Sequence, residues 1–358
     1  MMRPWPWRAK LMPLFTELSQ PNPMPHPLTA TEHRSRPWPL WKPILFLLVV
    51  AVGLYYVKWQ PYYGKAFLAA DTHSIGKSIL ANSDSSPWLA AWHYALVYFT
   101  AVWKAAVLGV VLGSLVQVLI PRDWLMRSLG HPRFSGTLLG AVIALPGMMC
   151  TCCAAPVAAG LRRQSVSSGA AMAFWLSNPV LNPATLIFMG FVLGWQFAAI
   201  RLVAGVIMVL GIAWLVQRAT AKDPQPFLGR WLKALWSLFW STIPIYILAV
   251  LALGAARVWL FPHADGAIDN SLLWIIGLAI AGCLFVIPTA AEIPIVQAMM
   301  LAGMGTGPAL ALLMTLPAVS LPSLLMLNKA FSAKALCLTA ALVALCGIVT
   351  GVVGMGLV

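Results

Sequence analysis

The sequence predicts an all-α polytopic membrane protein, built as an inverted repeat in which two re-entrant or broken helical hairpins meet at the bilayer midplane. Hydrophobic residues make up 61% of the chain and charged residues 9%. A water-soluble domain of this length could not cover its surface with so few charges, so the expected solvent is lipid. A recurring pattern of Pro and Gly inside the apolar segments, and the confinement of Lys and Arg to short breaks between them, predict the repeat and the topology.

The net charge of +14 does not indicate a nucleic-acid partner. Lys and Arg lie at the N-terminus and in short breaks between apolar runs, as the positive-inside rule distributes them. The six cysteines lie in apolar segments, so no disulfide framework is expected. The sequence contains no nucleotide-binding loop or zinc-ligand pattern. We expect no cofactor, no bound metal and no enzymatic activity; the expected partners are a small-molecule substrate and the lipid bilayer, and the sequence carries no signal for an oligomeric state.

The first 42 residues form a basic, Pro-rich leader without an apolar period, which we expect to be disordered and cytoplasmic. The leader is too long for the basic region of an ordinary signal peptide. Residues 43–58 are therefore predicted to be an uncleaved first transmembrane helix. A polar stretch, residues 58–87, follows this helix, and the remaining chain is nearly all apolar.

An internal duplication is indicated by Pro and Gly at identical intervals, inside segments where each residue disturbs a helix. The two sets are Pro156, Gly169, Pro179 and Pro294, Gly307, Pro317. We predict one permease repeat over residues 88–217 and a second, inverted one over residues 231–358.

Each repeat is predicted to contain a hairpin that does not cross the bilayer. The apolar stretch from Phe134 to Arg162 is interrupted at Pro146 and again around 150–156. The ten residues from Cys152 to Leu161 would form about 15 Å of helix, which is half a bilayer. The equivalent hairpin, residues 271–303, is expected to enter from the opposite side, because three crossings separate the two copies.

The first hairpin tip places three thiols and a hydroxyl beside unwound backbone, at Cys150, Thr151, Cys152 and Cys153. Thiols are soft ligands that suit trivalent arsenic, mercury, cuprous ion or sulfur compounds. Cysteine is also a small packing residue in membrane helices. Both interpretations of the cluster are open from the sequence.

The corresponding second tip contains Thr289 and Glu292, the latter being the only acidic residue in a predicted membrane segment after the first helix. A buried carboxylate is costly and needs a reason. Glu292 could accept a proton coupled to transport, or it could pair with Lys104 or with a hairpin N–H.

The helix after each hairpin is itself predicted to be broken, and breaks at matching positions point to a binding site. The polar residues at these breaks are Asn178 and Asn182 in the first copy and Ser320 in the second. The asparagines could hydrogen-bond a solute or cap the half-helices. The predicted helix breaks are Pro146, Pro156, Pro179, Pro288, Pro294 and Pro317.

The run from Cys150 to Pro179, Cys-Thr-Cys-Cys-Ala-Ala-Pro followed by a basic pair and Ser-Gly-Ala-Ala, resembles the predicted-permease family that includes the organoarsenical efflux permeases. That family has Cys-Ser-Cys before Pro, then small residues, a basic pair and Ser-Pro-Gly-Ala-Ala. The resemblance covers residues 90–358 and is sharp over 150–180. It implies a multi-pass permease of the bacterial inner membrane, with Cys150, Cys152 and Pro156 on the family's motif positions. Thr151 replaces the family's usual Ser and Cys153 is an extra thiol, so the substrate is not carried over.

Two function classes follow from these residues. The first is secondary transport of a small thiophilic or anionic solute, such as a metalloid or an organoarsenical, through a midplane site. The alternative is a membrane thiol–disulfide relay, for which Cys beside Pro would be natural. Such a relay needs a partner thiol, and in the second copy only Cys283 could serve.

Overall fold

The computed structural model describes residues 41–76, 87–220 and 268–357, all of which belong to one compact unit, Leu40–Val358. The leader 1–40, and with it nearly all of the predicted basic leader, lies outside the described residues. So does the segment 221–267, which contains the crossing predicted before the second hairpin. Within the described part every regular element is helical, and five helices are long and apolar enough to cross a membrane. The predicted class, an all-α polytopic membrane protein, is confirmed.

The first helix is longer than predicted. Elements α2 (Trp41–Leu54), η1 (Tyr55–Trp59) and α3 (Gln60–Thr72) form one continuous helix, so its predicted end at residue 58 is wrong. The sequence suggested an end there because the stretch that follows, residues 58–87, is polar. The chain instead widens into the single π-helical turn η1 just before Pro61, a local adjustment that lets a helix continue.

The second helix, α4 (Pro87–Leu119), packs tightly against α7 (Thr151–Arg163). A Cβ atom added at Gly109 would clash with the carbonyl oxygen of Cys153, and one at Gly113 with that of Pro156. Small residues four apart allow two membrane helices to approach at backbone distance. The two glycines therefore fix how deeply α7 sits against α4.

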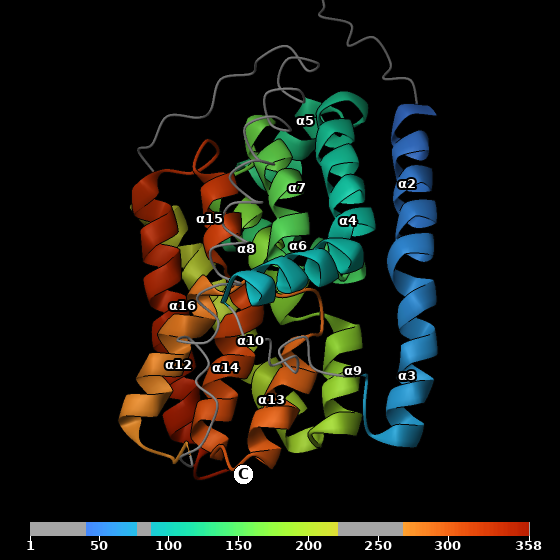
Figure 1. Cartoon of the computed structure of the whole chain (residues 1–358). Coiled ribbons are helices and arrows are strands. Elements are labelled where there is room, and N and C mark those ends of the chain that lie inside the picture. Colours follow the sequence, from blue (N-terminus) through green and yellow to red (C-terminus); the bar gives the residue numbers. More distant parts are fainter. Residues whose placement is uncertain (1–40, 77–86, 221–267, 358) are drawn as a thin grey trace, which may run out of the picture. The chain divides into compact units, whose positions relative to one another are not determined.

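Two helical hairpins occupy the places predicted for them. The first consists of α6 (Phe134–Ala144), a short 3-10 turn η3 (Leu145–Gly147) and α7. The second consists of α12 (Leu272–Leu284) and α13 (Glu292–Leu301), joined by the non-helical residues 285–291. In Figure 1 α7 lies in the upper part of the view and α13 in the lower part.

Three further helices follow each hairpin, and their starting points repeat. The starts of α6 and α12 lie 138 residues apart, and the same interval separates the starts of the three helices that follow each hairpin. Figure 1 shows α9 in the lower part of the view and α15 in the upper part, opposite to their hairpins. The helices of the first set are α8 (Ser168–Val180), α9 (Pro183–Val192) and α10 (Trp195–Ala219), and those of the second are α14 (Thr306–Ala318), α15 (Leu321–Leu327) and α16 (Ala333–Gly354).

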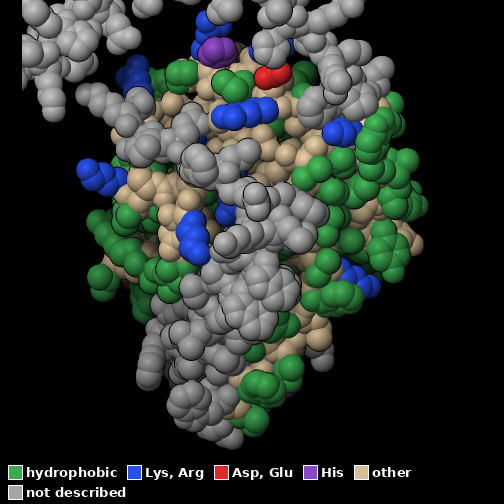
Figure 2. All heavy atoms as spheres, turned by 90° about the horizontal axis from the view of Figure 1, so that it is seen from above, with side chains coloured by type: hydrophobic (Ala, Val, Ile, Leu, Met, Phe, Trp, Pro, Cys, Tyr) green, Lys and Arg blue, Asp and Glu red, His purple; other side chains and the backbone are tan. Residues whose placement is uncertain are grey.

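The outer surface of the helices suits a lipid environment. Large apolar side chains such as Ile207 and Leu273 are 67% and 80% exposed, which water would penalise and lipid would not. Figure 2, which looks down on the end where α5 (Arg122–Leu125) lies, shows several Lys and Arg side chains and a single acidic one on this face. The polar end and the apolar sides are what a membrane protein requires.

Candidate functional site

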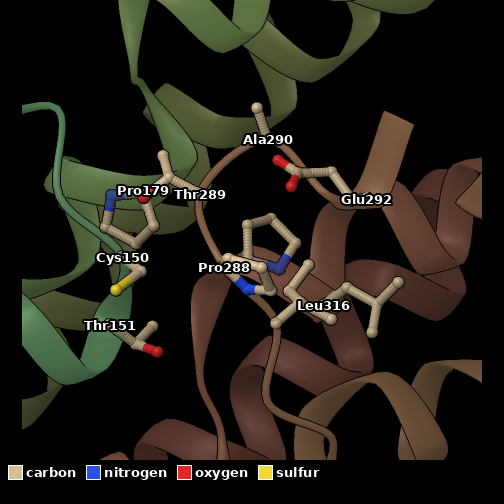
Figure 3. Close-up of a pocket in the computed structure, with 10 residues that line it drawn as sticks. Cys150, Thr151, Pro179, Pro288, Thr289, Ala290, Glu292 and Leu316 are labelled. Atoms are coloured by element: carbon tan, nitrogen blue, oxygen red, sulfur yellow. The ribbon is translucent and has the colours of Figure 1, made fainter. Parts of the chain in front are cut away.

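The tips of the two hairpins meet at a small pocket (Figure 3). Figure 3 shows Cys150 and Thr151 on one side and Pro288 and Glu292 on the other. The centre of a water molecule can move within about 10 Å³ inside the pocket, so the pocket has room for about one water molecule. Seven of its lining residues are ones that the sequence singled out: Cys150, Thr151, Pro179, Pro288, Thr289, Glu292 and Pro317.

The first tip is held in place by side chains of α8. The indole of Trp175 donates a hydrogen bond of 2.9 Å to the Thr151 carbonyl, where α7 begins. The side-chain oxygen of Asn178 accepts from the Met149 N–H at 3.4 Å, and its amide donates to the Phe174 carbonyl at 3.1 Å. Asn178 does not line the pocket and acts through the tip that it orders.

The three thiols of the first tip lie close together, and all six cysteines of the chain are free of disulfides. The Cys150 sulfur is 2.9 Å from that of Cys153 and 3.7 Å from that of Cys152. Cys150 faces the pocket, whereas Cys152 turns away to the Tyr98 hydroxyl at 3.1 Å. Among the described residues no group of three or more His, Cys, Asp and Glu is arranged to hold a metal ion.

Glu292, the first residue of α13, forms a buried ion pair that the sequence reasoning missed. Its partner is Arg201 on α10, at 2.9 Å, and both side chains are at most 2% exposed. The same guanidinium donates to the carbonyls of Pro179 at 3.0 Å and Val180 at 3.2 Å, at the end of α8. The other Glu292 carboxylate oxygen, Oε2, is buried and has no hydrogen-bond partner among the described residues. One cation therefore ties α13 to the broken end of α8 and leaves one carboxylate oxygen available.

Lys104, the partner considered for Glu292 from the sequence, lies elsewhere. Its ammonium sits 5.5 Å from the ring centre of Tyr56 and 5.8 Å from that of Trp103, on the exposed side of α4. The sequence feature that could have identified the partner is Arg201 itself. It lies six residues after Trp195 in a mostly apolar segment, at a depth in the membrane where charged side chains are rare.

A second buried cation, Lys58, also reaches the second tip and was not expected. It lies in the π-helical turn η1, is 6% exposed, and donates to the Thr289 hydroxyl at 3.1 Å and to the Tyr62 hydroxyl at 3.4 Å. Its neighbour Trp59 donates from the indole to the Pro146 carbonyl of the first tip at 2.9 Å. Consecutive residues of the first helix thus contact the two tips.

Helix α4 contacts both tips in the same way, through tyrosines one turn apart. Tyr98 bonds to Cys152 of the first tip, and the Tyr94 hydroxyl donates to the Val286 carbonyl of the second. Residues four apart lie on one face of a helix, which places both hydroxyls towards the pocket region.

The helix breaks after the hairpins are capped by the residues predicted there. Asn182 caps α9, its side-chain oxygen accepting from the N–H groups of Ala184 and Thr185. Ser320 begins α15 in a capping box with Ser323, and its hydroxyl lies 3.3 Å from that of Thr151. Asn182 does not line the pocket, while Ser320 joins the second copy to the first tip.

The predicted prolines differ in what they do. Pro146 lies in η3 and Pro288 in the non-helical second tip, while Pro179 and Pro317 sit in the last turns of α8 and α14. Pro294 lies in the first turn of α13, where its missing N–H costs nothing. The prediction of a break at Pro156 is wrong, because α7 continues through it from Thr151 to Arg163. The break in the first hairpin lies before Thr151.

The pocket collects backbone features that favour negative charge. Helices α7 and α13 both begin at it, with Thr151 and Glu292 as their first residues, so their free N–H groups point to one region. Each tip also contains a residue other than Gly with positive φ, Met148 at 47° and Ala290 at 69°. Backbone strain of this kind concentrates at functional sites.

Comparisons with known proteins identify a family. A family model described as "Predicted permease" matches residues 102–226 and again residues 231–355. UPF0718 protein YraQ of Escherichia coli strain K12 is 72% identical over 325 residues, which cover 87% of this chain and 94% of that protein. UPF0718 protein MJ0584 of Methanocaldococcus jannaschii is 31% identical over 153 residues, 41% of each chain. UPF0718 protein YcgR of Bacillus subtilis is 27% identical over 109 residues, 29% of this chain and 37% of that protein. No solved structure matches.

Proposed function

Because the chain belongs to the predicted permease family, we propose that it is a secondary permease that moves a small thiophilic or anionic solute through the pocket between the two hairpin tips. The observation that carries the proposal is that both tips line one pocket and that a buried carboxylate at its wall keeps one oxygen unpaired. A scaffold would gain nothing from such a costly group. A permease uses it to bind a solute or a proton.

Two kinds of group at the pocket support the choice of solute. Cys150 presents a soft sulfur, with the Cys153 sulfur 2.9 Å behind it. The starts of α7 and α13 present N–H groups and positive helix-dipole ends, which attract anions. Glu292 is the proposed proton acceptor, and its protonation would weaken its bond to Arg201. Solute movement would then depend on the proton gradient.

The pocket is in a closed state, because it has room for about one water molecule. Transport requires it to open to each side in turn. The opposite placement of α9 and α15 relative to their hairpins (Figure 1) supports an inverted repeat, with the pocket at the bilayer midplane. In such a repeat the two halves can exchange conformations, which opens the pocket first to one side and then to the other.

The basic end in Figure 2 supports an orientation in the bacterial inner membrane. Arg122 and Arg127 lie at this end, in the segment that connects α4 to the first hairpin. The positive-inside rule places such a segment on the cytoplasmic side. Helix α2 also begins at this end in Figure 1, so the N-terminus is proposed to be cytoplasmic.

Uptake into proteoliposomes tests the proposal, with radiolabelled arsenite and thiosulfate as probes. Cys150→Ala and Glu292→Gln should each reduce uptake of at least one probe, and uptake should follow an imposed proton gradient. Cys337→Ala is the matched control, because Cys337 lies exposed on α16, away from the pocket. Parent-level uptake in both pocket variants would remove the proposed site.

The thiol–disulfide relay remains the second candidate, and the Cys150–Cys153 distance of 2.9 Å favours it. Closing that disulfide releases two protons and two electrons, which a second, oxidised disulfide or a quinone would have to accept. Cys283 contacts the Ala340 carbonyl at 4.0 Å and no tip sulfur. A disulfide trapped between Cys283 and a tip cysteine in oxidised membranes would support the relay. Uptake of arsenite or thiosulfate at the parent level by Cys283→Ser would oppose it.

A further inference from the structure

The first helix lies outside the residues that the family model matches, which begin at 102, yet it supplies a charge to the site. Lys58 is 6% exposed and hydrogen-bonds the Thr289 hydroxyl, and Thr289 lines the pocket. The helix is firmly attached beyond this point as well. Gln297 of α13 donates to the His73 carbonyl at the end of α3 at 3.1 Å, and the His73 ring lies 2.7 Å from the Phe191 carbonyl of α9.

The charged side chains at the pocket carry one more positive charge than negative charges. Arg201 and Glu292 neutralise each other, whereas Lys58 makes no ion pair within the described residues. Its two partners are neutral hydroxyls, which use two of the three ammonium N–H donors. A buried ammonium without a counter-charge is unfavourable, and a bound anion would remove that penalty.

The position of Lys58 also has a structural cause. The π-helical turn η1 shifts the residues after it relative to a regular helix, and such turns occur frequently at functional sites. Lys58 lies on this turn and reaches Thr289 of the second tip, and the next residue, Trp59, reaches the Pro146 carbonyl of the first tip. A solute that carries both a negative oxygen and a soft atom would meet Lys58 and Cys150 together.

We propose that Lys58 is the cation of the solute site and that the solute is a small anion whose charge it neutralises. This inference rests on the proposed transport function and deepens it, because it selects anions over neutral thiophilic solutes. It also assigns the first helix to the transport machinery rather than to anchoring alone. The unpaired Glu292 oxygen then serves the proton that accompanies the anion.

Uptake of two probes into proteoliposomes distinguishes charge from thiol affinity. Arsenite at neutral pH is the uncharged acid and tests the thiols, while thiosulfate is an anion with a soft sulfur. Lys58→Met keeps the length of the side chain and removes its charge. It should lower thiosulfate uptake about 10- to 100-fold, the range expected for losing a charged hydrogen bond, and change arsenite uptake little.

Two further variants separate binding from folding. Lys58→Arg retains the charge and should keep most of the thiosulfate uptake. Lys104→Met removes a lysine that lies over aromatic rings away from the pocket, and it should behave as the parent. The ratio of thiosulfate to arsenite uptake is the deciding readout, because a purely structural role for Lys58 would lower both together.

The outcomes that overturn the inference are distinct from those that overturn transport. Equal thiosulfate uptake by the parent and Lys58→Met, or uptake of arsenite by the parent with none of thiosulfate, sulfite or phosphate, would refute the anion site and leave a permease. Failure of the parent to move arsenite and each of the three anions, thiosulfate, sulfite and phosphate, would refute both proposals.

Discussion

The buried Arg201–Glu292 pair gives the sharpest prediction, because the structure shows what each partner leaves behind when it is removed. Arg201→Met strands a carboxylate that is 2% exposed and removes the donors to the Pro179 and Val180 carbonyls. Removing one partner of a buried pair costs about 3–5 kcal/mol. We expect Arg201→Met to lower the free energy of unfolding by about that amount. Arg218→Met, on the same helix but stacked on the exposed Trp214 ring, should cost under about 1 kcal/mol.

The double variant Arg201→Met/Glu292→Met isolates the pairing energy. It removes the stranded carboxylate and leaves only the two carbonyls without donors, so it should be more stable than Arg201→Met by about 2 kcal/mol or more. Denaturant unfolding of the purified protein in detergent, followed by tryptophan fluorescence, measures all four corners of the cycle. Additive single-variant effects would mean that the two groups are not coupled in solution, and the account of the pocket wall would be wrong. The double variant should still fail to transport, because the pocket has lost its carboxylate.

Two further changes test how the pocket is positioned. Gly109→Ala places a methyl group against the Cys153 carbonyl, so it should destabilise the protein by about 1–3 kcal/mol and reduce uptake. Gly211→Ala is the control, because its methyl group would meet no atom within 4 Å, and it should change neither stability nor uptake. Equal melting temperatures of Gly109→Ala and the parent would contradict this packing. Asn182→Ala removes the cap of α9 and should cost about 1 kcal/mol in denaturant unfolding, while Asn182→Ser, which keeps an uncharged capping oxygen, should restore most of it. A larger loss of uptake than of stability would instead indicate solute contact.

The sequence predicted those parts of the fold that depend on local chemistry. The first hairpin followed from an apolar segment too short to cross a bilayer, and the second followed as its equivalent in the repeat of Pro and Gly. The capping role considered for Asn182 is observed, because a cap is a contact with the next two or three residues. The meeting of Cys150 and Glu292 at one pocket followed from the recurring Pro and Gly spacing.

The two cations of the site were missed for a physical reason. Arg201 and Glu292 are 91 residues apart, and Lys58 and Thr289 are 231 apart, so neither pair leaves a local pattern. Lys58 also lies where the polar stretch 58–87 was predicted to begin, whereas the helix continues through it to Thr72. Proline marks where a regular helix is disturbed, but whether the chain stops, as at Pro146, or continues, as at Pro156, depends on packing partners.

The strengths of the bonds across the pocket suggest how a solute and a proton would be coupled. The Thr151–Ser320 contact at 3.3 Å joins neutral hydroxyls and is worth about 1 kcal/mol, so it can break in each cycle. The Arg201–Glu292 pair is the only ion pair joining the two halves within the described residues, and it is the strongest link there. A proton on Glu292 weakens this link, and an anion drawn to the pocket replaces the negative charge that the proton removes. Opening is then most favourable when both have bound, which would make the flux of anion and proton interdependent.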